Sequence, residues 1–132
     1  MFIKVKPLVV HMAKTIYTAV FFGEGERHMT LTFRPTDQQI NDTPFGETVA
    51  VRKVGEMATD EFYGIAVEPV SDIIPTVSSG QPHITFGTFG DFKPGNIAQR
   101  MIDNPEIITP TPPSMFIGRI GRFMSDGTVR YD

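Results

Sequence analysis

Two short stretches of this chain repeat one pattern of chemically reactive side chains. The first reads His-Met-Thr from His28, and the second reads His-Ile-Thr from His83, in a chain with three histidines. Imidazole has an ordinary pKa near neutrality, so one histidine can remove a proton while the other supplies one. The hydroxyls of Thr30 and Thr85 can donate hydrogen bonds to phosphate oxygens. The two motifs together therefore suit attack at phosphorus.

In such a reaction, one imidazole takes a proton from an attacking water or ribose hydroxyl, and the other protonates the leaving oxygen. The threonines hold the non-bridging oxygens and share the developing charge. There is no HExxH pattern and no cluster of carboxylates beside either histidine, so we expect neither a metal ion nor a cofactor. The chain has no cysteine, which excludes disulfides and thiolate catalysis.

The alternation of polar and apolar residues predicts that both motifs lie on β-strands. Alternate residues of a strand share a face, so the His and Thr of each motif point the same way. The other residues of the first stretch are expected on the opposite, apolar face: Met29, Leu31 and Phe33. An ordinary half-buried strand alternates in the same way. The repeated order of His then Thr is therefore the stronger observation.

The rest of the chain predicts the elements that position these strands. Runs rich in β-branched and aromatic residues predict strands at 15–23, 27–33, 47–57, 61–70 and 83–89. The best helix candidate is 93–104, with Asn96 as its N-cap and an apolar stripe of Ile97, Met101 and Ile102. We expect one short helical turn between residues 34 and 46, an irregular proline-rich segment at 105–114, and a hairpin with an Asp-Gly turn at 113–132. This is an α+β pattern.

Each motif also closes a longer repeated unit. Residues 17–33 and 63–89 both begin with Tyr and a strand, pass through a turn and end on the His-x-Thr stretch. An inserted loop at 71–82 accounts for the greater length of the second unit. We interpret the pair as a degenerate duplication, in which an approximate two-fold axis brings the two histidines to one cleft.

Length and composition indicate one globular domain. The chain has 132 residues, of which 40% are hydrophobic and 20% charged, and a net charge of -3. We expect an N-terminal extension or strand at 1–12, in which His11 is structural or exposed and Met12 is an alternative start, followed by a motif-bearing core at 13–104. No apolar run approaches the roughly 18 residues of a membrane helix, so we expect no membrane partner and a cytoplasmic location.

The paired motifs resemble those of the 2H phosphoesterase superfamily, which is named for two His-x-Thr/Ser motifs. The resemblance covers roughly residues 13–104 and includes the stretches "RHMTLTF" and "PHITFGTFGDFKPGNI". The second stretch is most similar to tRNA-ligase-type cyclic phosphodiesterases and to a phage enzyme that degrades the cyclic oligonucleotide signals of CBASS defence. The chain departs from the family in being shorter, and "GEGER" replaces the helix before the first motif.

The resemblance implies a strand-rich, two-lobed fold with two pseudo-symmetric antiparallel sheet units around a central cleft and few helices. It also implies a metal-independent, cofactor-free hydrolase whose catalytic residues are His28, Thr30, His83 and Thr85. The first substrate to consider is a cyclic oligonucleotide, in the host cytoplasm if a phage encodes the chain. The alternatives are 2′,3′-cyclic phosphates or 2′-5′ linkages at RNA ends.

Residues beside the motifs are candidate substrate contacts: Tyr17, Arg27, Phe89, Phe92 and Lys93. Aromatic rings can stack on a nucleobase and cations can hold a phosphate, but core packing and solvated surface charge explain the same residues. Two other functions stay open, a nucleotide-binding sponge without turnover and a structural β-domain that forms homo-oligomers. Imidazoles that face one another would favour catalysis or binding, whereas histidines on opposite sides of the molecule would favour the structural role.

Overall fold

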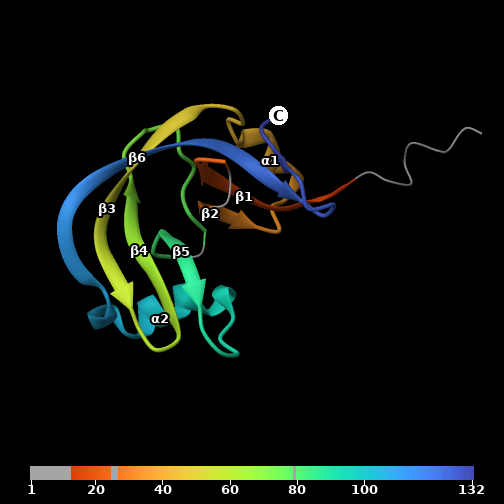
Figure 1. Cartoon of the computed structure of the whole chain (residues 1–132). Coiled ribbons are helices and arrows are strands. Elements are labelled where there is room, and N and C mark those ends of the chain that lie inside the picture. The colour runs from red at the N-terminus through yellow and green to blue at the C-terminus, as the bar shows by residue number, and fades with distance from the viewer. Residues whose placement is uncertain (1–12, 25–26, 79) are drawn as a thin grey trace, which may run out of the picture.

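The computed structural model describes residues 13–24, 27–78 and 80–132, so the expectations for residues 1–12, His11 and Met12 lie outside the described residues. Within the described ranges the fold is a strand-rich α+β arrangement with two short α-helices, as the sequence predicts (Figure 1). The elements in chain order are β1 (Thr15–Phe22), β2 (Arg27–Phe33), α1 (Asp37–Asp42), β3 (Thr48–Ala58), β4 (Phe62–Pro69), β5 (His83–Thr88), the 3-10 turn η2 (Pro94–Asn96), α2 (Ile97–Asp103), the 3-10 turn η3 (Pro105–Ile107), β6 (Thr109–Met124) and β7 (Val129–Arg130).

The strands form one antiparallel sheet in the order β1-β2-β5-β4-β3-β6-β7. Strand β1 also pairs with β6, so that six strands close into a barrel. Alternate residues of these strands point inward and fill the barrel with apolar side chains. The core consists of Val20, Met29, Leu31, Val49, Val51, Ile65, Val67, Ile74, Ile84 and Ile120.

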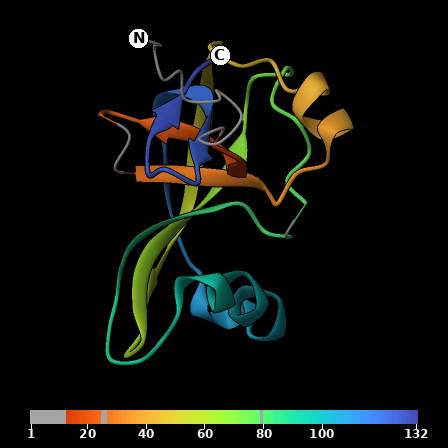
Figure 2. The ribbon, with the colours of Figure 1, turned by 90° about the vertical axis from the view of Figure 1, so that its right-hand side faces the viewer.

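The paired register between β2 and β5 is the shortest of any two neighbouring strands in the barrel. These two strands pair at one register position, Met29 opposite Ile84. In Figure 2, β1, β2 and α1 lie in the upper part of the molecule, and the far end of the β3–β4 hairpin lies with α2 in the lower part. The expected two-lobed fold with separate sheet units is not confirmed, because one sheet runs through both parts.

The two halves of the chain present their elements in the same order. Strand, strand, helix and strand follow one another as β1, β2, α1 and β3, and again as β4, β5, α2 and β6. The circular order of the six barrel strands is unchanged when β1 is exchanged with β4, β2 with β5, and β3 with β6. The two motif strands, β2 and β5, therefore occupy equivalent places and meet at the centre of this arrangement.

Helix α2 packs against the β3–β4 hairpin and forms a second, smaller core there. Its members are Met57, Phe62, Ala66, Ile97 and Met101. The predicted apolar stripe was wrong at Ile102, which is 54% exposed. Five residues along an α-helix turn the side chain by roughly 140°, so Ile102 leaves the face that Ile97 occupies.

The proline-rich segment departs from the sequence prediction. Residues 105–114 were expected to be irregular, but β6 begins at Thr109 and pairs along β3. The register slips between Lys53 and Gly55 of β3, where Gly55 lies opposite Pro110. Proline has an extended backbone angle but no N–H to donate, so it is tolerated in strands beside such irregularities.

The C-terminal hairpin was predicted correctly. Strands β6 and β7 pair through Arg122 with Arg130 and Phe123 with Val129. Gly127 in the turn has φ 87°, which favours glycine. Within the part of the chain that the structure describes, no helix has the length and apolar character needed to cross a membrane.

Candidate active site

The two motifs lie side by side at the seam between β2 and β5. Met29 and Ile84, the middle residues of the motifs, face each other and are buried in the barrel. Alternation along a strand then turns their neighbours to the outer face of the sheet. The side chains that flank the two buried residues are all half-buried there: His28, Thr30, His83 and Thr85.

Antiparallel pairing makes the two histidines diagonal neighbours. Continuing the register of the seam sets His28 opposite Thr85. It sets Thr30 opposite His83 in the same way. Diagonal positions of an antiparallel pair are about 7–8 Å apart, so His28 and His83 are near neighbours on this face, close enough for the charge of one to act on the other. The histidines therefore do not lie on opposite sides of the molecule.

Aromatic residues of β1 hold the ring of His28. Tyr17 stacks on this ring with 5.0 Å between the ring centroids, and Phe21 lies 5.7 Å away. Burial lowers the pKa of His28, and the positive charge that His83 can carry lowers it further. The His28 imidazole therefore favours its neutral form. Burial also raises the pKa of Tyr17, so its phenol keeps a proton to donate.

The ring of His83 is oriented by the backbone. Its Nδ1 lies 3.0 Å from the carbonyl oxygen of Gln81, to which Nδ1–H donates a hydrogen bond. Nε2 is then left for a ligand. Burial lowers the pKa of His83, but the hydrogen bond to Gln81 opposes this effect. The hydrogen bond to Gln81 therefore favours the protonated form of His83, against the effect of burial.

A groove of about 540 Å³ opens between this face of the sheet and η2–α2, and we call it the histidine groove. Strands β1, β2 and β5 supply one wall, and η2 and α2 supply the other. It is lined by Tyr17, Thr30, Phe33, His83, Thr85, Pro94, Gly95 and Ala98. His28 is not one of the lining residues, but its ring stacks on the lining residue Tyr17. An apolar groove with a few convergent polar groups is typical of small-molecule sites.

Phe33 lines this groove, although strand alternation predicted it on the opposite face of the sheet. It was expected on the apolar inner face with Leu31, but it is 58% exposed. Thr18 of β1 pairs with Thr32, and the next residue of β1 pairs with Thr30, so Leu31 is the extra residue of a β-bulge. The bulge shifts the alternation by one residue and turns Phe33 to the outer face. A bulge leaves no pattern in this sequence by which it could have been found.

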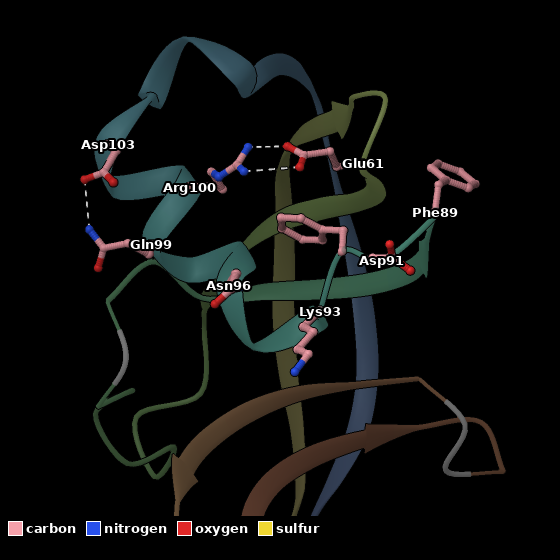
Figure 3. A pocket seen from close by; sticks show the side chains of 9 residues that line it. Glu61, Phe89, Asp91, Lys93, Asn96, Gln99, Arg100 and Asp103 are labelled. Atoms are coloured by element: carbon pink, nitrogen blue, oxygen red, sulfur yellow. Dashed lines mark hydrogen bonds and ion pairs between the residues drawn. The ribbon is translucent and has the colours of Figure 1, made fainter.

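Of the five predicted substrate contacts, the structure brings Tyr17 alone into the histidine groove. Arg27 donates a 2.8 Å hydrogen bond to the carbonyl of Phe86, and its guanidinium lies 4.8 Å from the centre of the Phe86 ring. Arg27 thus ties β2 to β5. Phe89, Phe92 and Lys93 line a different hollow, beside η2 and α2 (Figure 3).

Three further lining residues, in η2 and α2, were not predicted from the sequence. Pro94, Gly95 and Ala98 carry no reactive group, so nothing marked them as ligand contacts. Among the residues that the structure describes, no three His, Asp or Glu side chains gather as a set of metal ligands.

No protein-family model matches this chain, and no curated protein matches it.

Proposed function

We propose that this chain is a metal-independent phosphodiesterase that cleaves a nucleotide phosphodiester by acid–base catalysis at His28 and His83. One observation carries the proposal. The two His-x-Thr motifs, far apart in the sequence, meet across one strand seam with all four polar side chains on the same half-buried face. A purely structural repeat has no need for this convergence beside a groove.

The reaction proposed is hydrolysis by one water molecule. Neutral His28 removes a proton from water as the water oxygen forms a bond to phosphorus. The bond from phosphorus to the ribose oxygen breaks, and protonated His83 gives its proton to that oxygen. Each turnover consumes one water, produces a phosphate monoester and a free hydroxyl, and leaves the two histidines with exchanged protonation. Proton exchange with solvent restores them.

The remaining groups hold the substrate. Thr30 and Thr85 donate hydrogen bonds to the non-bridging oxygens, whose charge grows in the transition state. Tyr17 and Phe33 present rings along the histidine groove, on which a nucleobase can stack. A volume of about 540 Å³ lies in the range of small-molecule sites and suits one nucleotide.

Substrates that place phosphorus beside a ribose hydroxyl fit this chemistry. We propose a cyclic oligonucleotide as the first candidate, and 2′,3′-cyclic phosphates or 2′-5′ linkages at RNA ends as the alternatives. Such an enzyme would be a compact relative of the 2H phosphoesterases, and the equivalent places of β2 and β5 in the sheet support that kinship. A sponge that binds nucleotides without turnover would not require two histidines in one site.

The decisive experiment incubates the protein with cyclic di- and trinucleotides, RNA bearing a 2′,3′-cyclic phosphate and 2′-5′-linked oligonucleotides, and separates the products by chromatography. We expect cleavage of at least one class. Binding without cleavage of any of them would favour the sponge, and neither binding nor cleavage would refute the proposal.

The same assay tests metal independence. Both proton transfers are placed on imidazoles, so we expect an excess of EDTA to leave the rate of cleavage unchanged. A loss of activity with chelator that Mg²⁺, Mn²⁺ or Zn²⁺ restores would contradict the proposed mechanism.

A further inference from the structure

A second hollow of about 750 Å³, which we call the α2 pocket, opens beside η2 and α2. Its walls come from η2, α2, the β3–β4 turn and the segment after β5 (Figure 3). Glu61 and Arg100 form an ion pair across its upper edge and neutralise each other. The proposed mechanism makes no use of this pocket.

Among the described residues, three polar side chains of the α2 pocket take part in no capping bond or ion pair. Asn96 occupies the N-cap position of α2 but its side chain makes no capping hydrogen bond, whereas Thr36 at the start of α1 forms a complete capping box. Neither Asp91 nor Lys93 takes part in an ion pair with any residue that the structure describes. An ammonium, a carboxylate and an amide are therefore available to a ligand in one pocket.

Two phenylalanines of the α2 pocket differ in what they can do. Phe92 stacks on Phe62 with 5.3 Å between ring centroids, and the guanidinium of Arg100 covers it. Phe92 is therefore part of the core. Phe89 is 54% exposed and follows β5 at the mouth of the pocket, so its ring is open to a planar partner.

The α2 pocket adjoins the histidine groove. Lys93 and Asn96 line the pocket, whereas the residues between them, Pro94 and Gly95, line the groove. The wall between the two spaces is therefore one turn of chain. Gly95 has no side chain to add to the barrier between the two spaces. A Cβ atom at this position would meet no atom within 4 Å.

We propose that the α2 pocket binds the nucleotide next to the one held in the histidine groove. Phe89 stacks on its base, Asn96 and Asp91 meet the polar edge of that base, and Lys93 contacts its phosphate. This inference rests on the proposed function and narrows the substrate to chains or rings of at least two nucleotides. A mononucleoside cyclic phosphate fills the histidine groove alone.

Two substrates of the same chemistry test the inference. The first is adenosine 2′,3′-cyclic phosphate, and the second is the dinucleotide ApA with a 2′,3′-cyclic phosphate end. We expect Phe89→Ala and Lys93→Gln each to lower kcat/KM for the dinucleotide by about tenfold, because base stacking and a phosphate contact are lost. For the mononucleotide, kcat/KM should change by less than about twofold. Ile73→Ala and Lys14→Gln, at exposed positions outside both sites, serve as controls.

Binding measured without turnover separates this inference from the proposed function. In a His83→Ala background, calorimetric titration with the dinucleotide pApA should show an affinity about tenfold weaker when Phe89→Ala is added. An unchanged affinity would overturn the inference even if the wild-type enzyme cleaves both substrates. Equal losses on mononucleotide and dinucleotide would also overturn it. Cleavage of neither substrate, with the affinity difference intact, would exclude 2′,3′-cyclic phosphates as the substrate of the proposed function and leave the second binding site standing.

Discussion

His28 and His83 carry the same side chain but have different surroundings. The His28 imidazole lies against two aromatic rings, and burial and the charge of His83 both lower its pKa. His83 gives Nδ1–H to the Gln81 carbonyl, which stabilises its protonated form and partly offsets burial. These surroundings support the proposal that His28 is the base and His83 the acid, roles that the repeat itself leaves equivalent.

Replacing either histidine tests these roles. General acid–base groups contribute about 10²–10⁴-fold each, so His28→Ala and His83→Ala should each lower kcat by at least about 10²-fold. The double variant should be little worse than the poorer single variant, because the two residues act as one unit. Thr30→Val and Thr85→Val should lose less, since each removes one hydrogen bond. Single-turnover rates check this, and wild-type rates in both histidine variants would place the active site elsewhere.

The pH dependence of the reaction follows from the same pair. Activity requires one neutral and one protonated imidazole, so kcat/KM should be bell-shaped with two apparent pKa values that belong to the pair. Both histidines have a pKa below the ordinary value of about 6.5, so the optimum should lie on the acid side of that value. An optimum above pH 8, measured with buffers of constant ionic strength, would contradict the assignment.

At the scale of elements, the close fit of β4 against β5 fixes where His83 lies. A Cβ atom on Gly64 of β4 would come 2.5 Å from the carbonyl oxygen of Ile84, the residue that follows His83. That oxygen belongs to the backbone and has no rotamer by which to move away. Gly64 therefore lets β5 approach closely enough to present its motif beside β2.

Gly64→Ala should lower the free energy of unfolding by about 1–3 kcal/mol, the usual cost of forcing atoms into a packed interior. Gly87 of β5 is the matched control, because a Cβ atom there meets nothing within 4 Å. Gly87→Ala should be neutral or stabilise by up to about 1 kcal/mol, since alanine loses less backbone entropy on folding. Urea unfolding measures both, and equal effects of the two substitutions would contradict this account.

The elements were easier to predict than the shape of the site. Five strands and the helix after the second motif were found from hydrophobic periodicity, which depends on each residue and its near neighbours. The β-bulge at Leu31 and the start of β6 at Thr109 were not, because a partner strand decides both. The same holds for Phe33, Gly95 and Ala98, whose place in the groove depends on contacts between the two halves.

At the scale of the whole molecule, each half of the chain completes the barrel of the other. Strand β3 of the first half pairs with β4 and β6 of the second, and β6 pairs back to β1. Neither half closes a barrel alone. The motif seam lies where the halves meet through β2 and β5, so the candidate site is formed only when the entire sheet has closed.

The pH dependence of the free energy of unfolding tests whether the two histidines are buried in the closed sheet. The pKa of His28 and the pKa of His83 are both lower in the folded protein than the ordinary value of about 6.5 that the unfolded chain has. Between those values the unfolded state binds more protons, so the free energy of unfolding decreases as the pH falls from about 7 through 6.5 toward the folded-state values. Above about pH 7.5 both imidazoles are neutral in the folded and in the unfolded state, so this contribution to the free energy of unfolding is fully present there.

Urea unfolding at pH 7.5 and pH 5.5 measures this decrease. The carboxylates of Asp126 and Asp132, whose pKa values are lowered by neighbours, contribute at more acidic pH and stay ionised in both conditions. In the double variant His28→Gln and His83→Gln, two neutral amides replace the titrating rings. The decrease in the free energy of unfolding between the two pH values should therefore become much smaller than in the wild type. A variant that loses as much stability as the wild type between the two conditions would show that the imidazoles are not held in the folded sheet.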